Sequence, residues 1–494
     1  MNSYLLTAVL AIPLLGALLT ALFGPADPKG PRAIALMSTI ASLVATAALA
    51  LTRFDPVASG LQLEDMVAWL PGLKISYHVG VDGLSMAMLL LNALLCCVAV
   101  VASWNVRERP TMYFVLFQIL QAGVAGVFAA QDLLLFFVAW ELELIPMYFL
   151  IAIWGGARRE YAAMKFLLYT LAGSALMLVA FIGLYLIASN NADMSVILSQ
   201  HKNALHGTAL AWAELPLFLF LFVGFAVKLP SFPFHTWLPD AHVEASTPIS
   251  VILAGILLKM GAYGLIRFNW TLFPELVKDL APWLLALGAF NILYGALVAM
   301  RQTDMKKLIA YSSVSHMGFV LLGLAALNSA GINGAIFQMV SHGLITAMLF
   351  LGVGVVYDHT HTRDIEKLGG LAERMPVAAF LMIVASLASL GLPGLSGFVA
   401  EFLAFLGGFQ ANPAVTTAAA VGVVLTAFYM LFMVQRVYFQ QLKPENTQVV
   451  DCSLREALPQ AILAVLVLAI GCYPALLGHT VNSFVVAYMP GLGL

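Results

Sequence analysis

Charged residues are scarce in this sequence. Only 10% of its 494 residues are charged and 62% are hydrophobic, so polar side chains are too few to cover a water-exposed globule of this size. The formal net charge is −2 and the basic residues are scattered, which argues against a nucleic-acid partner. The composition predicts an all-α polytopic membrane protein surrounded by the lipid bilayer.

Motifs that bind metals or cofactors are also lacking. The four cysteines form no CxxC pair and no His/Cys ligand spacing, which argues against an iron–sulfur cluster or a structural zinc. No Gly-x-Gly-x-x-Gly follows a strand pattern, and the sequence has no Walker loop. We therefore expect no metal, no bound cofactor and no redox chemistry in this chain.

Hydrophobic runs are abundant, and about fourteen of them are long enough to cross a bilayer. The first lacks the basic region of a cleaved signal peptide and is predicted to be the first helix of the mature protein. The runs lie near residues 3–23, 31–52, 83–104, 111–129, 132–153, 163–188, 211–229, 246–268, 281–300, 307–326, 332–357, 376–411, 413–435 and 457–478.

Two of these runs are predicted to contain broken helices. Lys228 ends one run, and Pro230 and Pro233 follow it; each proline removes a backbone donor and disfavours helix in the residue before it. The run 376–411 is too long for one straight crossing and contains Gly391–Gly397 near its middle. Irregular backbone of this kind is tolerated in a membrane where it lines a cavity.

Basic residues are unevenly divided between alternate connections. Sixteen fall in one set and five in the other, so the positive-inside rule places the richer set in the cytoplasm and both termini on the outer side. The richer set is Lys29, Arg32, Arg107, Arg109, Arg158, Arg159, Lys165, Arg301, Lys306, Lys307, Arg363, Lys367, Arg374, Arg436, Lys443 and Arg455; the poorer set is Arg53, Lys74, Lys202, Arg267 and Lys278.

Weak internal matches indicate a repeat. Leu229-Pro230 aligns with Leu392-Pro393 and Tyr263 with Tyr429, and five helices per unit imply that the second unit enters the membrane in the opposite sense. We predict two inverted five-helix repeats, each with one broken helix. The expected boundaries are 1–110 for helices 1–3, 111–270 for the first repeat (helices 4–8), 271–440 for the second repeat (helices 9–13), and 441–494 for helix 14.

Lys228 and Lys259 remain inside the predicted membrane region. The Lys259 stem reaches about 6 Å, whereas the interface is about 15 Å from the midplane, so its ammonium must face protein or water. Burying that charge costs about 3 kcal/mol or more, which favours release of the proton and suits a proton carrier. The alternative is a lysine bound by carbonyls that only holds helices together.

Acidic and histidine side chains lie at similar depth. Glu141 is nine residues after Asp132, about 13 Å into the membrane, and is the expected partner of Lys228. Glu143 lies about 200° around the helix from Glu141 and is interpreted as a packing or interface carboxylate. In the second half, the candidates for a relay are His316, His342 and Glu401, although either histidine alone could be a hydrogen-bonded core residue.

Other polar segments have simpler interpretations. Asp358–Asp364 is rich in histidine and acid but is expected to be a solvated cytoplasmic connection. Asp240, His242 and Glu244 follow the first break and could form a proton-uptake mouth or a polar cap. The aromatic cluster at Phe232–Trp237 is expected to serve packing and interface anchoring.

At these motifs the sequence resembles the antiporter-like membrane subunits of respiratory complex I, most of all their chain M branch. The resemblance covers nearly the whole chain, and the segment from Lys228 to Pro248 is its most specific part. The motifs are Trp140-Glu141 with Pro146, Lys228-Leu-Pro-x-x-Pro, Leu257-Leu-Lys259-x-Gly-x-Tyr263-Gly, Ala310-Tyr-Ser-Ser-Val-Ser-His316, the segment around His342, and Gly394-x-Ser-Gly397-Phe-x-x-Glu401.

The resemblance implies that Glu141 and Lys228 are a coupling pair, that Lys259 is the central proton carrier, and that His316, His342 and Glu401 continue the path. It also implies a multi-pass protein of the bacterial inner membrane with antiporter-like neighbours on both sides. NADH, FMN, iron–sulfur clusters and quinone are expected in partner subunits of an NADH-quinone oxidoreductase. The alternatives are a subunit of a multi-subunit Na+/H+ antiporter or membrane-bound hydrogenase, or a scaffold that transports nothing.

Overall fold

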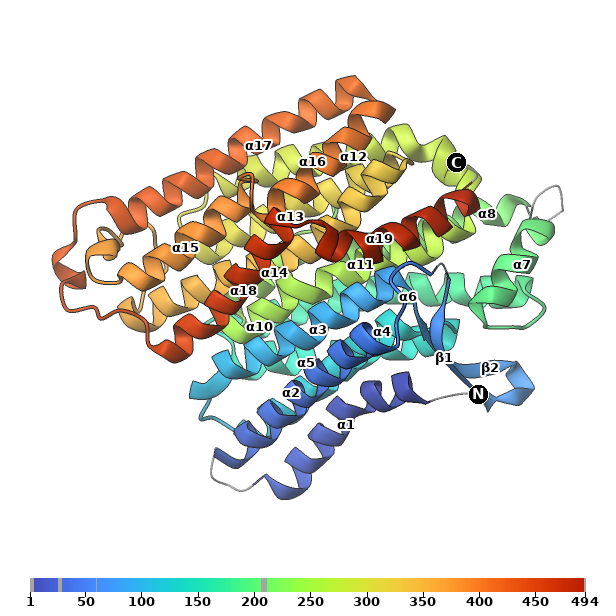
Figure 1. The fold of residues 1–494 in the computed structure, drawn as a ribbon, viewed down its shortest axis with the longest axis horizontal. Coiled ribbons are helices and arrows are strands. Elements are labelled where there is room, and N and C mark those ends of the chain that lie inside the picture. Colours follow the sequence, from blue (N-terminus) through green and yellow to red (C-terminus); the bar gives the residue numbers. More distant parts are fainter. Residues whose placement is uncertain (1–3, 25–28, 59, 206–210, 493–494) are drawn as a thin grey trace.

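The protein is a bundle of long helices that run in roughly the same direction (Figure 1). The computed structural model describes residues 4–24, 29–58, 60–205 and 211–492. Within this part of the chain, twelve helical stretches are long and apolar enough to cross a membrane. They are α1 (Leu5–Phe23), α2 (Lys29–Thr52), α3 (Gly83–Ala102), α4 (Pro110–Ala129), α5 (Leu133–Trp154), α6 (Arg159–Ile187), the stretch Thr247–Trp270, α12 (Pro274–Ala299), α13 (Met305–Ala325), α14 (Ser329–Thr360), α17 (Pro413–Val434) and α18 (Leu454–Cys472).

Both predicted breaks are present. The first separates α8 (Glu214–Lys228) from α9 (Trp237–Glu244), and the second separates α15 (Pro376–Ser389) from α16 (Ser396–Ala411). The prolines at the first break and the glycines at the second end each helix, as their backbone restrictions require. Each pair of short helices corresponds to one predicted crossing that lies outside the twelve long stretches, and the total of fourteen stays a prediction.

Short polar side chains fix where several long helices begin. Asp82, Asp132, Asp304 and Asn328 each accept a hydrogen bond from a backbone N–H in the first turn of the helix that follows. Such caps satisfy donors that have no partner within the helix. They fix the starts of α3, α5, α13 and α14.

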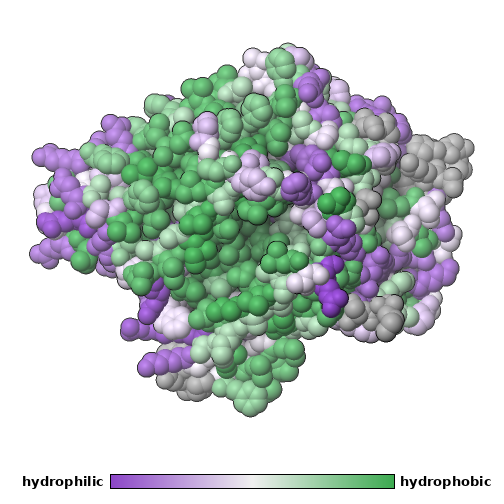
Figure 2. Space-filling model, viewed as in Figure 1, coloured by the Kyte–Doolittle hydropathy of each residue, from purple (hydrophilic) through white to green (hydrophobic). Residues whose placement is uncertain are grey.

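Burial separates central helices from peripheral ones. The most apolar 18-residue windows of Thr247–Trp270 and α14 are 100% buried, and that of α13 is 94% buried. By contrast, only 28% of the window in α1 and 33% of that in α2 is buried. The outer helices present a broad hydrophobic band between more polar ends (Figure 2). The helices that carry Lys259, His316 and His342 therefore lie at the centre of the molecule.

The stretch Thr247–Trp270 is not a uniform α-helix. It consists of α10 (Thr247–Ile252), a π-helical segment η4 (Leu253–Leu257), α11 (Leu258–Gly264) and a second π-helical segment η5 (Leu265–Trp270). Such wide turns are rare and often mark functional sites. Lys259 is the second residue of α11, the short α-helix between the two π-helical segments.

Three elements lie outside the predicted hydrophobic runs. An antiparallel hairpin joins β1 (Gln62–Leu70) and β2 (Ile75–Val81), and pairs Met66 with His78. Helix α7 (Met194–Leu205) follows α6, and α19 (Ala475–Tyr488) follows α18. The hairpin and α7 lie at the end of the bundle where both chain termini are found (Figure 1).

Candidate functional site

A buried ion pair lies at the first broken helix. Lys228, the last residue of α8, donates to Glu143 of α5, and neither side chain is more than 1% exposed. The Lys228 ammonium also lies 5.6 Å from the ring centroid of Trp140 and 5.2 Å from that of Phe166. A buried charge is tolerated only with a partner, and Glu143 supplies the counter-charge for Lys228 at this position.

The expected partner of Lys228 was Glu141, and this pairing is wrong. Glu141 is half-buried on α5, and its buried Oε1 has no hydrogen-bond partner among the described residues. Its neighbours Leu142 and Ile145 are exposed. The two glutamates lie at nearly the same depth along α5, but depth does not determine how the helix is rotated about its axis. Because they lie about 200° apart around the helix, Glu143 points inward and Glu141 points toward the outer surface.

Lys259 is fully buried between two acceptors. Its Nζ donates to the carbonyl of Ala254 at 2.5 Å and lies 2.8 Å from Nδ1 of His342. Ala254 is five residues before Lys259 and belongs to the π-helical segment η4, whose wide turn frees carbonyl oxygens from the ordinary i to i−4 pattern. The segment thus supplies a backbone ligand for the ammonium.

His342 and His316 extend the line away from Lys259. Their ring centroids are 5.6 Å apart, and Nε2 of His316 lies 3.6 Å from Oε1 of Glu401. The side chains of His342, His316 and Glu401 are all buried, so they are shielded from bulk water. The structure therefore brings together four of the predicted site residues, Lys259, His342, His316 and Glu401, and places Lys228 in a separate pair.

The second break holds the end of this line. Nε2 of His316 also lies 3.0 Å from the carbonyl oxygen of Ser389, the last residue of α15, where the break leaves carbonyls unpaired. Gly391 has φ +77°, and a Cβ there would lie 2.7 Å from Oε2 of Glu401. The backbone conformation favours glycine, and any side chain here would displace the carboxylate of Glu401. The break thus shapes the surroundings of His316 and Glu401 together.

Backbone contact joins the first break to the Lys259 helix. A Cβ added at Gly261 would lie 2.5 Å from the backbone nitrogen of Leu229 and 2.6 Å from the carbonyl oxygen of Phe225. The missing side chain lets α11 pack directly on the end of α8, two residues after Lys259 and beside Lys228. A displacement of the break would therefore be transmitted to α11.

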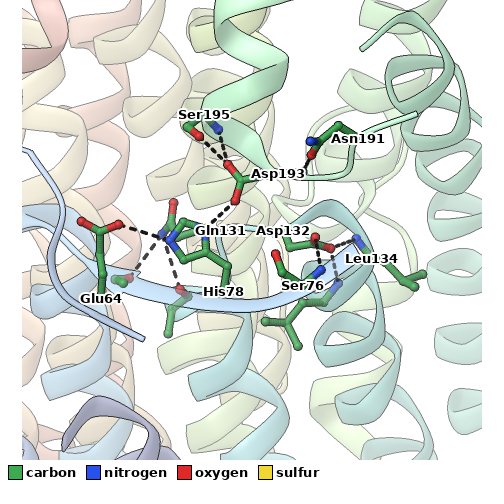
Figure 3. Close-up of polar contacts among 12 residues, drawn as sticks. Glu64, Ser76, His78, Gln131, Asp132, Leu134, Asn191, Asp193 and Ser195 are labelled. Atoms are coloured by element: carbon green, nitrogen blue, oxygen red, sulfur yellow. Dashed lines mark hydrogen bonds and ion pairs between the residues drawn. The ribbon is translucent and has the colours of Figure 1, made fainter. Parts of the chain in front are cut away.

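A second polar cluster lies at the hairpin (Figure 3), and the hairpin is at the end of the bundle that holds the termini (Figure 1). His78 Nδ1 is 2.6 Å from Asp193, and its Nε2 is 3.2 Å from Glu64. The hydrogen bond to Asp193 raises the pKa of His78, although burial opposes this. Burial alone would raise the pKa of Asp193, but hydrogen bonds from His78 and Ser195 hold it below its usual value. The cluster ties the hairpin to the connection between α6 and α7.

The remaining candidates have simpler positions. Trp237 is fully buried and donates from Nε1 to the carbonyl of Val227 at 2.9 Å, in keeping with packing. Asp240 is paired with Lys165 at 2.7 Å, and Glu244 accepts from the backbone nitrogen of Arg158. Asp358 is exposed near the end of α14. Among the described residues, no group of three metal-ligating side chains could hold a metal ion.

Sequence reasoning missed Glu143 as the partner of Lys228, and it assigned no role to the cluster at His78. The histidine and its two carboxylates come from segments up to 115 residues apart, between the predicted helices, so no local pattern connects them. The only indication of this cluster in the sequence is that two acidic residues and a histidine lie outside the hydrophobic runs.

Known proteins are similar to this chain in sequence. A family described as NADH:quinone oxidoreductase/Mrp antiporter, TM matches residues 130–428. The NADH-quinone oxidoreductase subunit M of Rhodobacter capsulatus is 43% identical, covering 99% of this chain and 98% of the relative. NAD(P)H-quinone oxidoreductase chain 4 2 of Thermosynechococcus vestitus is also 43% identical, covering 96% of this chain and 90% of the relative.

Two solved structures have a similar fold. A chain of respiratory complex I from Thermus thermophilus superposes with a TM-score of 0.89 at 31% identity, covering 99% of this chain and 100% of that chain. A chain of the Mrp complex from Dietzia sp. DQ12-45-1b gives a TM-score of 0.83 at 26% identity, covering 98% of this chain and 52% of that one. The complex I chain is thus matched over its whole length, and the Mrp chain over about half.

Proposed function

Because the chain belongs to the NADH:quinone oxidoreductase/Mrp antiporter transmembrane family, we propose that it is the antiporter-like, proton-translocating subunit of an NADH-quinone oxidoreductase. The resemblance that the sequence motifs indicated is confirmed by matches over nearly the full chain. In this function the chain moves protons across the bilayer, while partner subunits bind NADH, FMN, iron–sulfur clusters and quinone and carry out the redox steps.

The observation that carries this function is the buried line from Lys259 to Glu401. Lys259 gives a proton to Nδ1 of His342, which lies 2.8 Å away. His342 releases the proton from Nε2 toward His316, and His316 passes it to the carboxylate of Glu401 at 3.6 Å. Imidazole suits this role because it accepts a proton on one nitrogen and releases one from the other. Glu401 then delivers the proton to the exit.

Coupling to electron transfer begins at the Glu143–Lys228 pair. The charge of Glu141 acts on Glu143, and Glu141 faces the outer surface of the bundle. A charge change in an antiporter-like neighbour is felt first by Glu141, which weakens or strengthens the Glu143–Lys228 pair. Movement at the break then reaches α11 through its backbone contact at Gly261, and the balance between protonated and neutral Lys259 changes.

Membrane placement completes the proposal. The richer set of basic connections faces the cytoplasm, both termini face the outer side of a bacterial inner membrane, and antiporter-like neighbours lie on both sides. The two inverted repeats span 111–270 and 271–440, flanked by 1–110 and 441–494. Each proposed repeat contains one broken helix, and this supports the boundaries.

Substitution of Lys259 tests the function. In purified complex reconstituted into vesicles, Lys259→Met should lower NADH-driven proton translocation at least about tenfold, because a positioned proton-transfer group is removed. Lys278→Met, a partly exposed lysine on α12 paired with Glu275 at 3.2 Å, is the matched control and should leave pumping unchanged. Normal pumping by Lys259→Met in an assembled complex would instead favour a scaffold that transports nothing.

A subunit of a multi-subunit Na+/H+ antiporter is the second candidate, favoured by the likeness to the Mrp chain. The two functions differ in partners. Copurification of flavin-containing and iron–sulfur subunits with the tagged chain supports the oxidoreductase, whereas a complex without them supports the antiporter.

A further inference from the structure

The β-hairpin is tied to the start of α5 by hydrogen bonds. The N–H of Gln131 donates to the carbonyl of His78 at 2.9 Å, and the N–H of Ser76 donates to the Asp132 carboxylate at 3.0 Å. The same carboxylate caps α5 by accepting from two backbone N–H groups of its first turn. Asp132 therefore holds both β2 and α5, so a shift of β2 would move the beginning of this helix.

The connection between α6 and α7 is joined to the same place (Figure 3). The residues before and after Asp193 each form a main-chain hydrogen bond of 2.9 Å with the start of α5. The Asp193 carboxylate itself lies 2.6 Å from Nδ1 of His78. We call these three joined segments, residues 76–78, 131–133 and 192–195, the hairpin clasp. Its contact between His78 and Asp193 is the one that closes the ring from the connection back to β2.

Water can reach the contact between His78 and Asp193. Their side chains are only 8% and 7% exposed, but a cavity of about 720 Å³ opens beside them. Glu64, Lys74, His78 and Asp193 all contribute to its wall. The cavity is polar and wide enough for many water molecules. Protons from the water at this end of the molecule can therefore exchange with His78.

Acidic groups prevail around the hairpin clasp. The hydrogen bond to Asp193 and the charges of Asp193 and Glu64 raise the pKa of His78, although burial opposes this. The other charged groups on elements packed against β2 have partners of their own. They are Lys74 in the hairpin turn, with Ser189; Asp65 of β1, with Thr7; Asp132 at the start of α5, with Ser76; and Asp82 and Arg267, with each other.

We propose that the hairpin clasp positions α5 for coupling and that its hold depends on the acidity of the outer side, an inference that rests on the proposed function. Glu143, the partner of Lys228, is eleven residues after Asp132, about 16 Å along α5. Protonated His78 binds Asp193 and holds the start of α5, which keeps Glu143 turned toward Lys228. When His78 loses its proton to water, this contact weakens and α5 is free to turn. His78 and Asp193 are thus positioning residues that act through α5.

The hairpin clasp favours coupling while a proton gradient is present. Because the pKa of His78 is raised, its charged contact is complete below about pH 6.5 and is lost as the pH rises through the folded-state value. Pumped protons acidify the outer side, which protonates His78 and strengthens the contact. An alkaline outer side has the opposite effect, and fewer protons are then pumped for each electron transferred.

The test uses the whole complex in vesicles. NADH added to the medium drives only complexes whose NADH site faces the medium, so in the proposed orientation the hairpin of every active complex faces the lumen. The number of protons pumped per electron is measured at a series of lumen pH values, with the pH of the medium held constant. This ratio should fall as the lumen pH rises above about 6.5 and through the raised pKa of His78, while uncoupled electron transfer stays constant.

Four variants separate the charged contact from general disruption. His78→Gln should give a flat profile at the low ratio that the unchanged complex shows in an alkaline lumen. Asp193→Asn should move the fall by about 1 pH unit or more toward lower pH, since an adjacent opposite charge is removed. Glu64→Gln should move it less, because Glu64 is half-exposed and 3.2 Å from the ring. His479→Gln, at an exposed histidine of α19, is the matched control and should keep the unchanged profile.

Two results would overturn the role of the hairpin clasp. One is a profile in His78→Gln that follows that of the unchanged complex. The other is a response to the pH of the medium instead of that of the lumen. Should His78→Gln fail to assemble, the shifts in Asp193→Asn and Glu64→Gln still decide, because a merely structural contact would not move the pH at which the ratio falls.

Failure of this inference is distinguishable from failure of the proposed function. Normal pumping by Lys259→Met would reject the function itself. Loss of pumping in Lys259→Met at every lumen pH, together with a profile that His78→Gln and Asp193→Asn leave unaltered, would reject only the role of the hairpin clasp.

Discussion

Glu141 and Glu143 lie two positions apart on α5 and have different surroundings. Glu143 is sealed in the interior against Lys228, whereas Glu141 is half-buried beside exposed apolar neighbours. Removing one partner of a buried ion pair leaves the other charge uncompensated, which costs far more than losing an exposed charge. The two glutamates should therefore differ in what their loss does to the protein.

Glu143→Gln should destabilise the protein by about 3–5 kcal/mol, since it leaves the Lys228 ammonium buried without a counter-charge. Glu141→Gln removes a half-buried carboxylate with no ion pair and should leave stability nearly unchanged while reducing coupled pumping. Thermal unfolding of the purified complex and pumping in vesicles measure the two effects. Equal loss of stability in both variants would contradict the assignment of Glu143 as the partner of Lys228.

At the residue scale, the sequence predicted how deep each ionisable side chain lies in the membrane, but not which way the side chains of α5 point. It identified Lys259, His316, His342 and Glu401 as buried ionisable residues, and the structure joins them in one line. Intramembrane charges are rare, so each one stands out by type alone. The partner of Lys228 depended instead on the rotation of α5, which is set by packing on neighbouring helices and leaves no local trace in the sequence.

At the scale of elements, the breaks were predictable and the π-helical segments were not. Proline and glycine restrict the backbone wherever they occur, so the ends of α8 and α15 follow from residue type. The wide turns at Leu253–Leu257 and Leu265–Trp270 are built from ordinary helix-compatible residues. Their conformation comes from contacts within the bundle, including the acceptor role of Ala254 toward Lys259.

The hairpin is held by groups whose charge depends on pH. The hydrogen bond to Asp193 raises the pKa of His78 above 6.5, so the stabilisation by this contact is complete below about pH 6.5 and is lost as the pH rises through the folded-state value. The pKa of Asp193 is held below 3.8, so its contribution is present above about pH 3.8 and is lost as the pH falls through its lower folded-state value. The contact is strongest between these limits.

Hydrogen exchange of β2 should report this dependence. After correction for the intrinsic effect of pH, exchange in residues 75–81 should speed up as the pH rises above about 6.5 and through the raised pKa of His78, because His78 then loses its charge. His78→Gln should exchange faster at the lower pH and show little further change. Exchange in α13 serves as the internal control, because its described residues form no hydrogen bond or ion pair with His78, Glu64 or Asp193. A flat profile for β2 would contradict the charged contact.

At the scale of the whole molecule, the sequence predicted the membrane class from composition and the central helices from their buried charges. It left out the hairpin, α7 and α19 because these elements are too short to cross a bilayer and give no long hydrophobic run of their own. Figure 1 shows the hairpin, α7 and both termini at one end of the bundle. That end should be the outer face if the richer basic connections are cytoplasmic.

Cysteine labelling tests this orientation. In a background with Cys96, Cys97, Cys452 and Cys472 replaced by serine, Glu275→Cys at the start of α12 should react with a membrane-impermeant maleimide from the outside of intact cells. Lys367→Cys, in the connection after α14, should react only in inside-out vesicles. Both side chains are exposed, at 60% and 70%, so the reagent can reach either one if it is on the accessible side.

The uneven distribution of basic residues makes insertion in the opposite sense unfavourable. Labelling of Lys367→Cys from outside intact cells would reverse the orientation.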